Sequence, residues 1–292
     1  GAAVVSTSGV DGALSALDRL GRAERLPWPV AWRGIFQPAE ETSDGAESMI
    51  RAGAMDSIDA IIALHVDPTR QAGSVGVRPG VFTASCDLLR TTIHGRGGHA
   101  ARPHESVDPI AAAAQLVSTL YQFIPRSTDS QDAVVVSFGQ IHGGLNANVI
   151  PEEVVLEGTV RTLNRQVRER TIANIHRLAQ GIESVTGTKI ELAFDTGIGS
   201  VDNDPTLTSL VERVARELLG EDNVSRMPRP SMGGEDFAAY LEHAPGSMFR
   251  LGCAGNSGTW PGLHTPTFDV DEKCIVVGAK ILARTVVEWA KP

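Results

Sequence analysis

The stretch VAWRGIFQPAEETSDGAESMIRAGAMDSIDAIIALH, residues 30–65, decides the fold that we expect for this chain. Residues 30–36 form a short apolar run that predicts a buried strand. Pro38 ends this strand because proline has no N–H to donate to a sheet. A short helix is expected next, and then a second buried strand over residues 60–64. Two strands joined by a helix form a βαβ unit, in which the strands lie parallel and their carboxyl ends open on the same side.

Carboxylate and imidazole side chains follow these two strands. Glu40 and Glu41 come directly after the first strand, and His65 follows the second. We expect the three to converge at the sheet edge where open α/β sheets bind ligands. Adjacent carboxylates are most often a solvated surface, but Zn-type metals favour carboxylate and imidazole ligands. His264, in the glycine-rich loop after an expected strand, is a second imidazole candidate, although an exposed loop histidine is its plainer interpretation.

The middle of the chain changes from buried runs to the alternation of half-buried strands. Strands are expected over residues 87–94, 134–141, 154–162 and 189–194, with helices over residues 110–124 and 167–185. The order β-α-β-β-α-β is that of a ferredoxin-like domain, a half-open sheet with helices on one face. We therefore expect an α/β fold in which residues 1–78 and 198–292 form one domain, with a mainly parallel sheet flanked by helices, interrupted by a ferredoxin-like insert of residues 79–197.

A glycine-rich run, HGRGGHAARPH, occupies residues 94–104 at the end of the first strand of the insert. Its Gly95-x-Gly97-x-x-Ala100 spacing is similar to a dinucleotide-binding fingerprint, but Pro103 interrupts the helix that such a fingerprint requires. We interpret the run as a flexible glycine turn that presents His99. A tight turn with solvent-exposed histidines is an equal alternative.

The composition excludes several classes of protein. The 292 residues carry 26 Lys and Arg against 35 Asp and Glu, a net charge of −9 that repels nucleic acid and anionic membranes. The apolar runs are far shorter than the roughly 20 residues that cross a bilayer. Three cysteines without a C-x-x-C pair favour neither a disulfide framework nor a thiolate zinc cluster. We expect a cytoplasmic protein without nucleic-acid or membrane partners.

Seven ordered motifs resemble the M20 metallopeptidases, and in particular their amidohydrolase branch of hippurate hydrolases, N-acetyldiaminopimelate deacetylases and auxin-conjugate hydrolases. The motifs occupy residues 34–41, 63–66, 95–104, 146–151, 157–162, 232–237 and 263–266. The resemblance implies two divalent metal ions (zinc, manganese, cobalt or nickel) in the larger domain, and a homodimer formed through residues 79–197, which also act as a lid. It implies an enzyme that cleaves small N-acyl amino acids, acetyl or benzoyl derivatives among them, with a metal-activated water.

The resemblance also implies a role for each of seven residues. They are Glu40 as the general base, Glu41, His65 and His264 as metal ligands, His99 as the group that reaches across the dimer to polarise the scissile carbonyl, and Asn148 and Arg161 as the residues that hold the substrate carboxylate.

One departure from the family pattern is clear. Two further metal ligands of the family come from a Cys-Gly-His-Asp-x-His segment ahead of the first helix, and the sequence has no such segment. We therefore expect the chain to be the C-terminal portion of a protein longer by about 100 residues. Two other functions stay open: a dipeptidase with the same metal chemistry, and a non-catalytic dimeric binding protein that kept the pocket without the metals.

Overall fold

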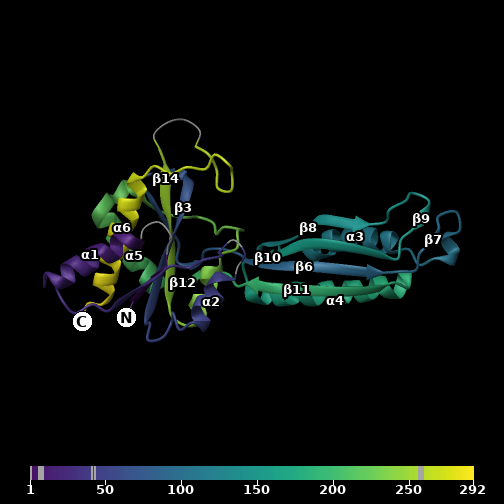
Figure 1. Ribbon diagram of the computed structural model, residues 1–292, viewed down its shortest axis with the longest axis horizontal. Coiled ribbons are helices and arrows are strands. Elements are labelled where there is room, and N and C mark those ends of the chain that lie inside the picture. Colours follow the sequence, from purple (N-terminus) through teal and green to yellow (C-terminus); the bar gives the residue numbers. More distant parts are fainter. Residues whose placement is uncertain (1, 6–9, 41, 43, 256–259) are drawn as a thin grey trace. The chain divides into compact units, whose positions relative to one another are not determined.

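The computed structural model describes the whole chain except residues 1, 6–9, 41, 43 and 256–259. The chain divides into two compact units, which are coloured along the sequence in Figure 1. The first unit contains Gly1–Phe82, Val201–Ser231 and Glu235–Pro292, and the second contains Thr83–Ser200 with Met232–Gly234. Met232–Gly234 belongs to the second unit although it follows well after Ser200 in the sequence.

The first unit is built on a six-stranded sheet in the order β13-β4-β14-β3-β1-β2. Its strands are β1 (Ala2–Val5), β2 (Trp32–Ile35), β3 (Ala60–Gln71), β4 (Val75–Val77), β13 (Val224–Arg226) and β14 (Gly246–Ala254). The four strands β2, β1, β3 and β14 run parallel, and β4 and β13 run opposite to them. The expected mainly parallel sheet is thus confirmed. A separate antiparallel pair joins β5 (Gly80–Val81) to β12 (Asp202–Asn203).

Two details of the expected βαβ unit were wrong. β2 and β3 are not neighbours, because β1 lies between them, and β2 is an edge strand with only Ile35 buried. β3 continues to Gln71, so that His65 lies in the middle of this strand and not at its end. The continuation is half-exposed and polar, and its length is set by pairing with β14 rather than by apolar content.

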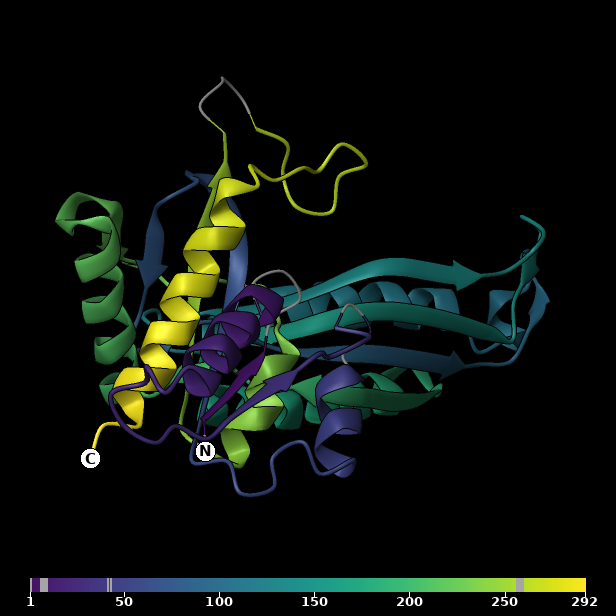
Figure 2. The same cartoon turned by 60° about the vertical axis from the view of Figure 1, so that its left-hand side comes forward.

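Helices cover both faces of this sheet. They are α1 (Val10–Arg22), α2 (Gly45–Arg51), α5 (Pro205–Leu219) and α6 (Lys273–Trp289), with the 3₁₀ turns η2 (Glu221–Asn223) and η3 (Asp236–Glu242). The apolar sides of α1, α5 and α6 form one core with β3, β4 and β14, and Figure 2 shows α1 lying beside α6. Asp204 caps α5 by accepting a hydrogen bond of 2.7 Å from the Leu207 N–H.

The two faces of β3 lie in different surroundings. Ala60, Ile62 and Leu64 belong to the core under the three helices. Successive side chains of a strand point to opposite faces, so His65 points away from that core. Arg250 of β14 pairs in register with His65 and shares its face. This second face therefore carries the polar side chains of the sheet.

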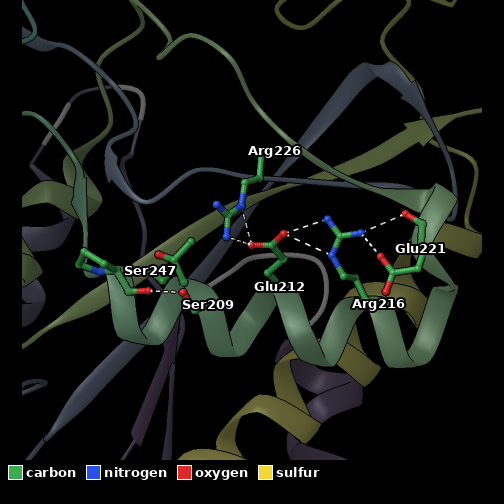
Figure 3. Close-up of polar contacts among 8 residues, drawn as sticks. Ser209, Glu212, Arg216, Glu221, Arg226 and Ser247 are labelled. Atoms are coloured by element: carbon green, nitrogen blue, oxygen red, sulfur yellow. Dashed lines mark hydrogen bonds and ion pairs between the residues drawn. The ribbon is translucent and has the colours of Figure 1, made fainter.

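A buried carboxylate fixes α5 to the edge strand β13 (Figure 3). Glu212 is only 8% exposed and accepts hydrogen bonds from Arg216, at 2.9 and 3.2 Å, and from Arg226, at 2.9 Å. Burial opposes ionisation of Glu212, but the hydrogen bonds from Arg226 and Arg216 outweigh it and lower the pKa of the carboxyl. A satisfied buried carboxylate of this kind stabilises the unit only while both partners are present.

The second unit has the expected ferredoxin-like fold. Its elements are β6 (Ser85–His94), α3 (Pro109–Ser127), β8 (Val134–Gly143), β10 (Glu153–Thr162), α4 (Arg165–Thr186) and β11 (Lys189–Ile198). The four strands form an antiparallel sheet in the order β11-β6-β10-β8, with α3 and α4 packed on one face. Asp108, which precedes Pro109, caps α3 by accepting from the Ile110 N–H at 2.9 Å. Among the described residues, no helix combines the length and the apolar character that crossing a membrane requires.

Candidate metal centre and substrate residues

Three carboxylates gather on the polar face of the first unit. Glu40 lies in the loop between β2 and α2, and Glu235 and Asp236 lie at the start of η3. One carboxylate oxygen from each lies within 4.8 Å of the other two. Burial, followed by repulsion from Glu40 and Asp236, raises the pKa of Glu235 to about 8. Crowding of negative charge to this degree is typical of a site that takes up a cation or a proton.

His65 has the form that a metal ligand requires. Its Nδ1 lies 2.7 Å from the carbonyl oxygen of Val66, which can only accept, so the proton is on Nδ1 and Nε2 carries the lone pair, for which the described residues show no hydrogen bond. Burial, followed by the charge of Arg250, lowers the pKa of His65 and keeps its ring neutral. A backbone carbonyl that fixes the tautomer of a histidine is the usual support of a metal ligand.

His264 belongs to the same neighbourhood. Its charge acts on His65 and contributes to the lowered pKa of that ring. The residue is exposed and has a left-handed φ of 58°, a conformation that is uncommon outside glycine. The side chain of Thr265 supports the turn by donating a hydrogen bond of 2.8 Å to the carbonyl oxygen of Gly262.

One cation is already present among these groups. Arg250 pairs in register with His65, and its guanidinium lies 5.4 Å from the centre of the Phe82 ring. Burial lowers the pKa of Arg250, while the charges of Glu235 and Asp67 oppose that effect. This arginine offsets part of the negative charge of the three carboxylates.

The donors on this face fit divalent metal ions. Neutral imidazole nitrogen and carboxylate oxygen are the ligands that zinc and manganese take. His65 and His264 supply nitrogen, and Glu40 and Glu235 supply oxygen. Both oxygens of Asp236 already accept hydrogen bonds from Gln37. Glu41, the carboxylate ligand expected from the sequence, lies outside the described residues.

His99 lies in the second unit, on a small antiparallel pair of β7 (Gly98–His99) and β9 (Val149–Ile150). Its side chain is exposed, and its Nδ1 accepts from the Ala101 N–H at 3.1 Å, so Nε2 carries the proton of the neutral ring. The carbonyl of Asn148 accepts from the Ala100 N–H at 3.0 Å. The structure thus brings His99 and Asn148 together.

The expectation of a flexible glycine turn before His99 was wrong. The Arg96 and Val107 backbones exchange hydrogen bonds of 2.8 and 2.9 Å, and the Gly95 N–H donates to the Glu152 carbonyl at 2.8 Å. A Cβ at Gly95 would lie 2.2 Å from the Val107 carbonyl oxygen. Glycine is needed here because the backbone at Val107 approaches closely, and not because the chain must turn.

Arg161 lies at the other end of the same unit. It pairs with Cys86 near the start of β6, and it donates a hydrogen bond of 3.0 Å to the carbonyl oxygen of Met232. β10 runs from Glu153, close to β9, to Thr162, so about eight residues at roughly 3.3 Å each separate the two ends. Within one chain, Arg161 is therefore far from His99 and Asn148.

Comparison with known proteins identifies the family of this chain. Residues 3–288 match the sequence profile described as "Peptidase family M20/M25/M40". The chain belongs to the M20 peptidase family. The resemblance drawn from the seven motifs is confirmed.

Among the M20 relatives is "Probable hydrolase sll0100" of Synechocystis sp., 42% identical over 273 residues, or 93% of this chain and 68% of the relative. N-acetylcysteine deacetylase of Bacillus subtilis is 37% identical over 255 residues, or 87% of this chain and 65% of the enzyme. A crystal structure of Bacillus subtilis YxeP, described as a dinuclear metal binding peptidase of the M20 family, superposes with a TM-score of 0.77 at 31% identity, covering 96% of this chain and 70% of that one. The matched relatives include hydrolases that act on amide bonds. The M20 chain spans about two thirds of the length of these relatives.

Sequence reasoning gave no role to Glu235, Asp236 or Arg250. The first two were part of a quoted motif, and one signal could have drawn attention to them: the two carboxylates stand together immediately before an apolar run of residues 237–240. The structure buries both of them. Buried acidic residues usually bind something. Arg250 gave no such signal, because a single arginine in a strand is ordinary until its register with His65 is known.

Proposed function

We propose that this M20 chain is part of an enzyme that hydrolyses the amide bond of N-acyl amino acids, with a water activated by two divalent metal ions. The observation that carries the proposal is the neutral ring of His65, with its Nδ1 proton fixed and its lone pair on Nε2, on the face that holds Glu40. The likeness to N-acetylcysteine deacetylase favours an acyl amino acid as the substrate class.

In the proposed site His65, His264 and Glu41 hold the metal ions. When bound, such ions lower the pKa of water and stabilise the negative charge that develops on the amide oxygen. Glu40 is close to Glu235 and Asp236 and is not needed as a ligand in this proposal. Its carboxylate takes the proton from the attacking water and delivers it to the leaving nitrogen.

His99, Asn148 and Arg161 complete the proposed site from the second unit. The Nε2–H of His99 donates to the oxygen of the scissile carbonyl. The guanidinium of Arg161 and the amide of Asn148 hold the substrate carboxylate. Arg161 lies at the opposite end of β10 from Asn148 and His99. The three can therefore meet one substrate only if two chains contribute them.

We accordingly propose a homodimer formed through residues 79–197. β8 is an edge strand of the antiparallel sheet, paired with β10 on one side. It also exposes Val135 and Ile141, by 40% and 59%. An apolar edge strand is a natural pairing surface, and the same strand of a second copy fits it by two-fold symmetry.

The test combines turnover with metal content. The natural full-length protein, loaded with Mn²⁺, is given N-acetylcysteine, N-benzoylglycine and a dipeptide of unsubstituted amino acids. We expect hydrolysis of the acyl amino acids, and Glu40→Gln should retain the metal while losing a factor of about 100 to 10,000 in turnover. Glu47→Gln, which changes an exposed carboxylate of α2, is the matched control and should keep full turnover.

Mixed dimers test the role of His99. Glu40→Gln and His99→Ala chains are each inactive in the proposal, but a heterodimer of the two has one site with both residues intact. Mixing them should restore activity. A protein that binds Mn²⁺ and hydrolyses none of the three compounds would contradict the proposed activity and favour the non-catalytic binding protein, and hydrolysis of the dipeptide alone would favour the dipeptidase.

A further inference from the structure

A hydrogen-bonded network ties the loop that carries Glu40 to η3. Asp236 accepts from Gln37 Nε2 through both of its carboxylate oxygens, at 2.8 and 2.7 Å. The same carboxylate accepts from the Ala46 N–H at 3.0 Å. Tyr240 donates to Gln37 Oε1 at 2.9 Å. One buried side chain of η3 therefore holds both the beginning and the end of the loop.

The direction of each bond in this network is fixed. Both oxygens of Asp236 accept, one of them also from the Ala46 N–H, so the amide nitrogen of Gln37 faces this carboxylate. The amide oxygen of Gln37 is then left for Tyr240, which must donate. Burial, followed by the charge of Asp236, raises the pKa of Tyr240 and keeps its proton in place. Only an amide side chain at Gln37 can donate to the one partner and accept from the other.

The network sets the shape of the loop, which would otherwise be unfavourable. Ala39, next to Glu40, has a left-handed φ of 55°, a conformation that costs a non-glycine residue about 1 kcal/mol or more. The chain also closes on itself: a Cβ at Gly45 would lie 1.8 Å from the Pro38 carbonyl oxygen. Strain of this kind persists only where surrounding contacts over-determine the backbone.

We propose that Asp236, acting through Gln37 and together with Tyr240, is the positioning residue that aims Glu40 at the reacting water. The inference rests on the proposed function only for the role of Glu40; the hold on the loop is a property of the fold. Asp236 is 3% exposed and Tyr240 is fully buried, so neither residue needs to touch the substrate. Their effect reaches the chemistry through the position of one carboxylate.

The decisive variants exchange the two partners. Gln37→Glu places a carboxylate against Asp236 and should release the loop. The double variant Gln37→Glu with Asp236→Asn keeps the net charge and reconnects the two side chains with the direction of their bond reversed: the new amide of residue 236 donates to the new carboxylate of residue 37. That carboxylate still accepts from Tyr240, and the amide oxygen of residue 236 still accepts from the Ala46 N–H. Repair by the second substitution would show that the two side chains act as one hydrogen-bonded pair, because two independent defects in a buried network would add rather than cancel.

Two measurements follow these variants. Hydrogen exchange of peptides covering residues 36–50 reports on the Ala46 amide without any need for activity. With the acyl amino acid that the parent protein hydrolyses, kcat should fall about 10- to 100-fold in Gln37→Glu while KM stays within about twofold, because a base acts only in the transition state. The double variant should regain most of both the protection and kcat. Tyr240→Phe, which removes one bond, should show a smaller loss of kcat of the same kind.

Glu212→Gln is the matched control, because it weakens a buried carboxylate network of the same unit on α5. It should lower the melting temperature and leave kcat and the exchange of residues 36–50 unchanged. The inference is overturned if Gln37→Glu alters neither exchange nor kcat, or if the double variant restores neither. A parent protein without amide hydrolysis would refute the proposed function alone, and hydrogen exchange would then decide whether Asp236 holds the loop. Should Gln37→Glu not fold, Tyr240→Phe decides by the same two measurements.

Discussion

The pKa of Glu235 makes a quantitative prediction about the metal-free protein. Burial and the neighbouring carboxylates of Glu40 and Asp236 raise this pKa from 4.5 to about 8. The folded chain therefore binds the proton of Glu235 more tightly than the unfolded chain does. The resulting stability is fully present below pH 4.5 and is lost as the pH rises through 8.

The magnitude follows from linkage. Relative to the protein with Glu235 protonated, the raised pKa lowers the free energy of unfolding by about 0.8 kcal/mol at pH 5 and by about 3.3 kcal/mol at pH 7. Glu235→Gln mimics the neutral acid and removes this cost. Relative to the parent protein, the variant should therefore gain about 2.5 kcal/mol of unfolding free energy between pH 5 and pH 7.

The assay is urea unfolding in EDTA, at pH 5, 6 and 7, for the parent, Glu235→Gln and Glu212→Gln. The last is a control of opposite sign, because the pKa of Glu212 is lowered by Arg226 and Arg216 despite its burial. Its carboxylate stabilises the fold above the ordinary glutamate range, so Glu212→Gln should lose stability relative to the parent as the pH rises. A difference between Glu235→Gln and the parent that is the same at pH 5 and pH 7 would refute the reasoning.

Two further predictions concern the second unit. Arg168→Ala should lower the free energy of unfolding by about 3 to 5 kcal/mol, because it leaves the carboxylate of Asp87 buried without its partner. That side chain is 2% exposed and accepts from Nη2 and Nε of Arg168 at 2.6 and 2.8 Å. Arg165→Ala, which breaks an exposed pair, should cost no more than about 1 kcal/mol, and equal losses in calorimetry would contradict the distinction. Gly95→Ala should force the backbone away from the Val107 carbonyl oxygen, 2.2 Å from the new Cβ, and so speed hydrogen exchange of the Val107 amide, which donates to the Arg96 carbonyl. Unchanged protection of that amide would show that the two backbone segments can move apart without losing this hydrogen bond.

The sequence predicted those elements whose signals are local. The alternation of Leu89 and Ile93 with polar neighbours placed β6, and its buried face is the one expected. Asp108 before a proline fixed the start of α3 within a residue. Such signals depend on side chains a few positions apart, and a strand or a cap keeps them wherever it packs.

The candidate site was only partly predictable for the same reason. Glu40, His65 and His264 could be named from motifs, but nothing in the sequence placed β1 between β2 and β3 or extended β3 past His65. Those features depend on which strands pair, and pairing is decided by packing over the whole unit.

By itself, then, the sequence determined the mainly parallel sheet, the ferredoxin-like insert and the residue types that suit a metal ion. Only the tertiary structure decided how the site is held. Gln37 and Asp236 are separated by 199 positions, and each alone is an ordinary polar residue. Their meeting depends on η3 packing beside the loop that follows the edge strand β2, which no local pattern encodes. The hydrogen bonds that shape the Glu40 loop exist only after that packing is complete.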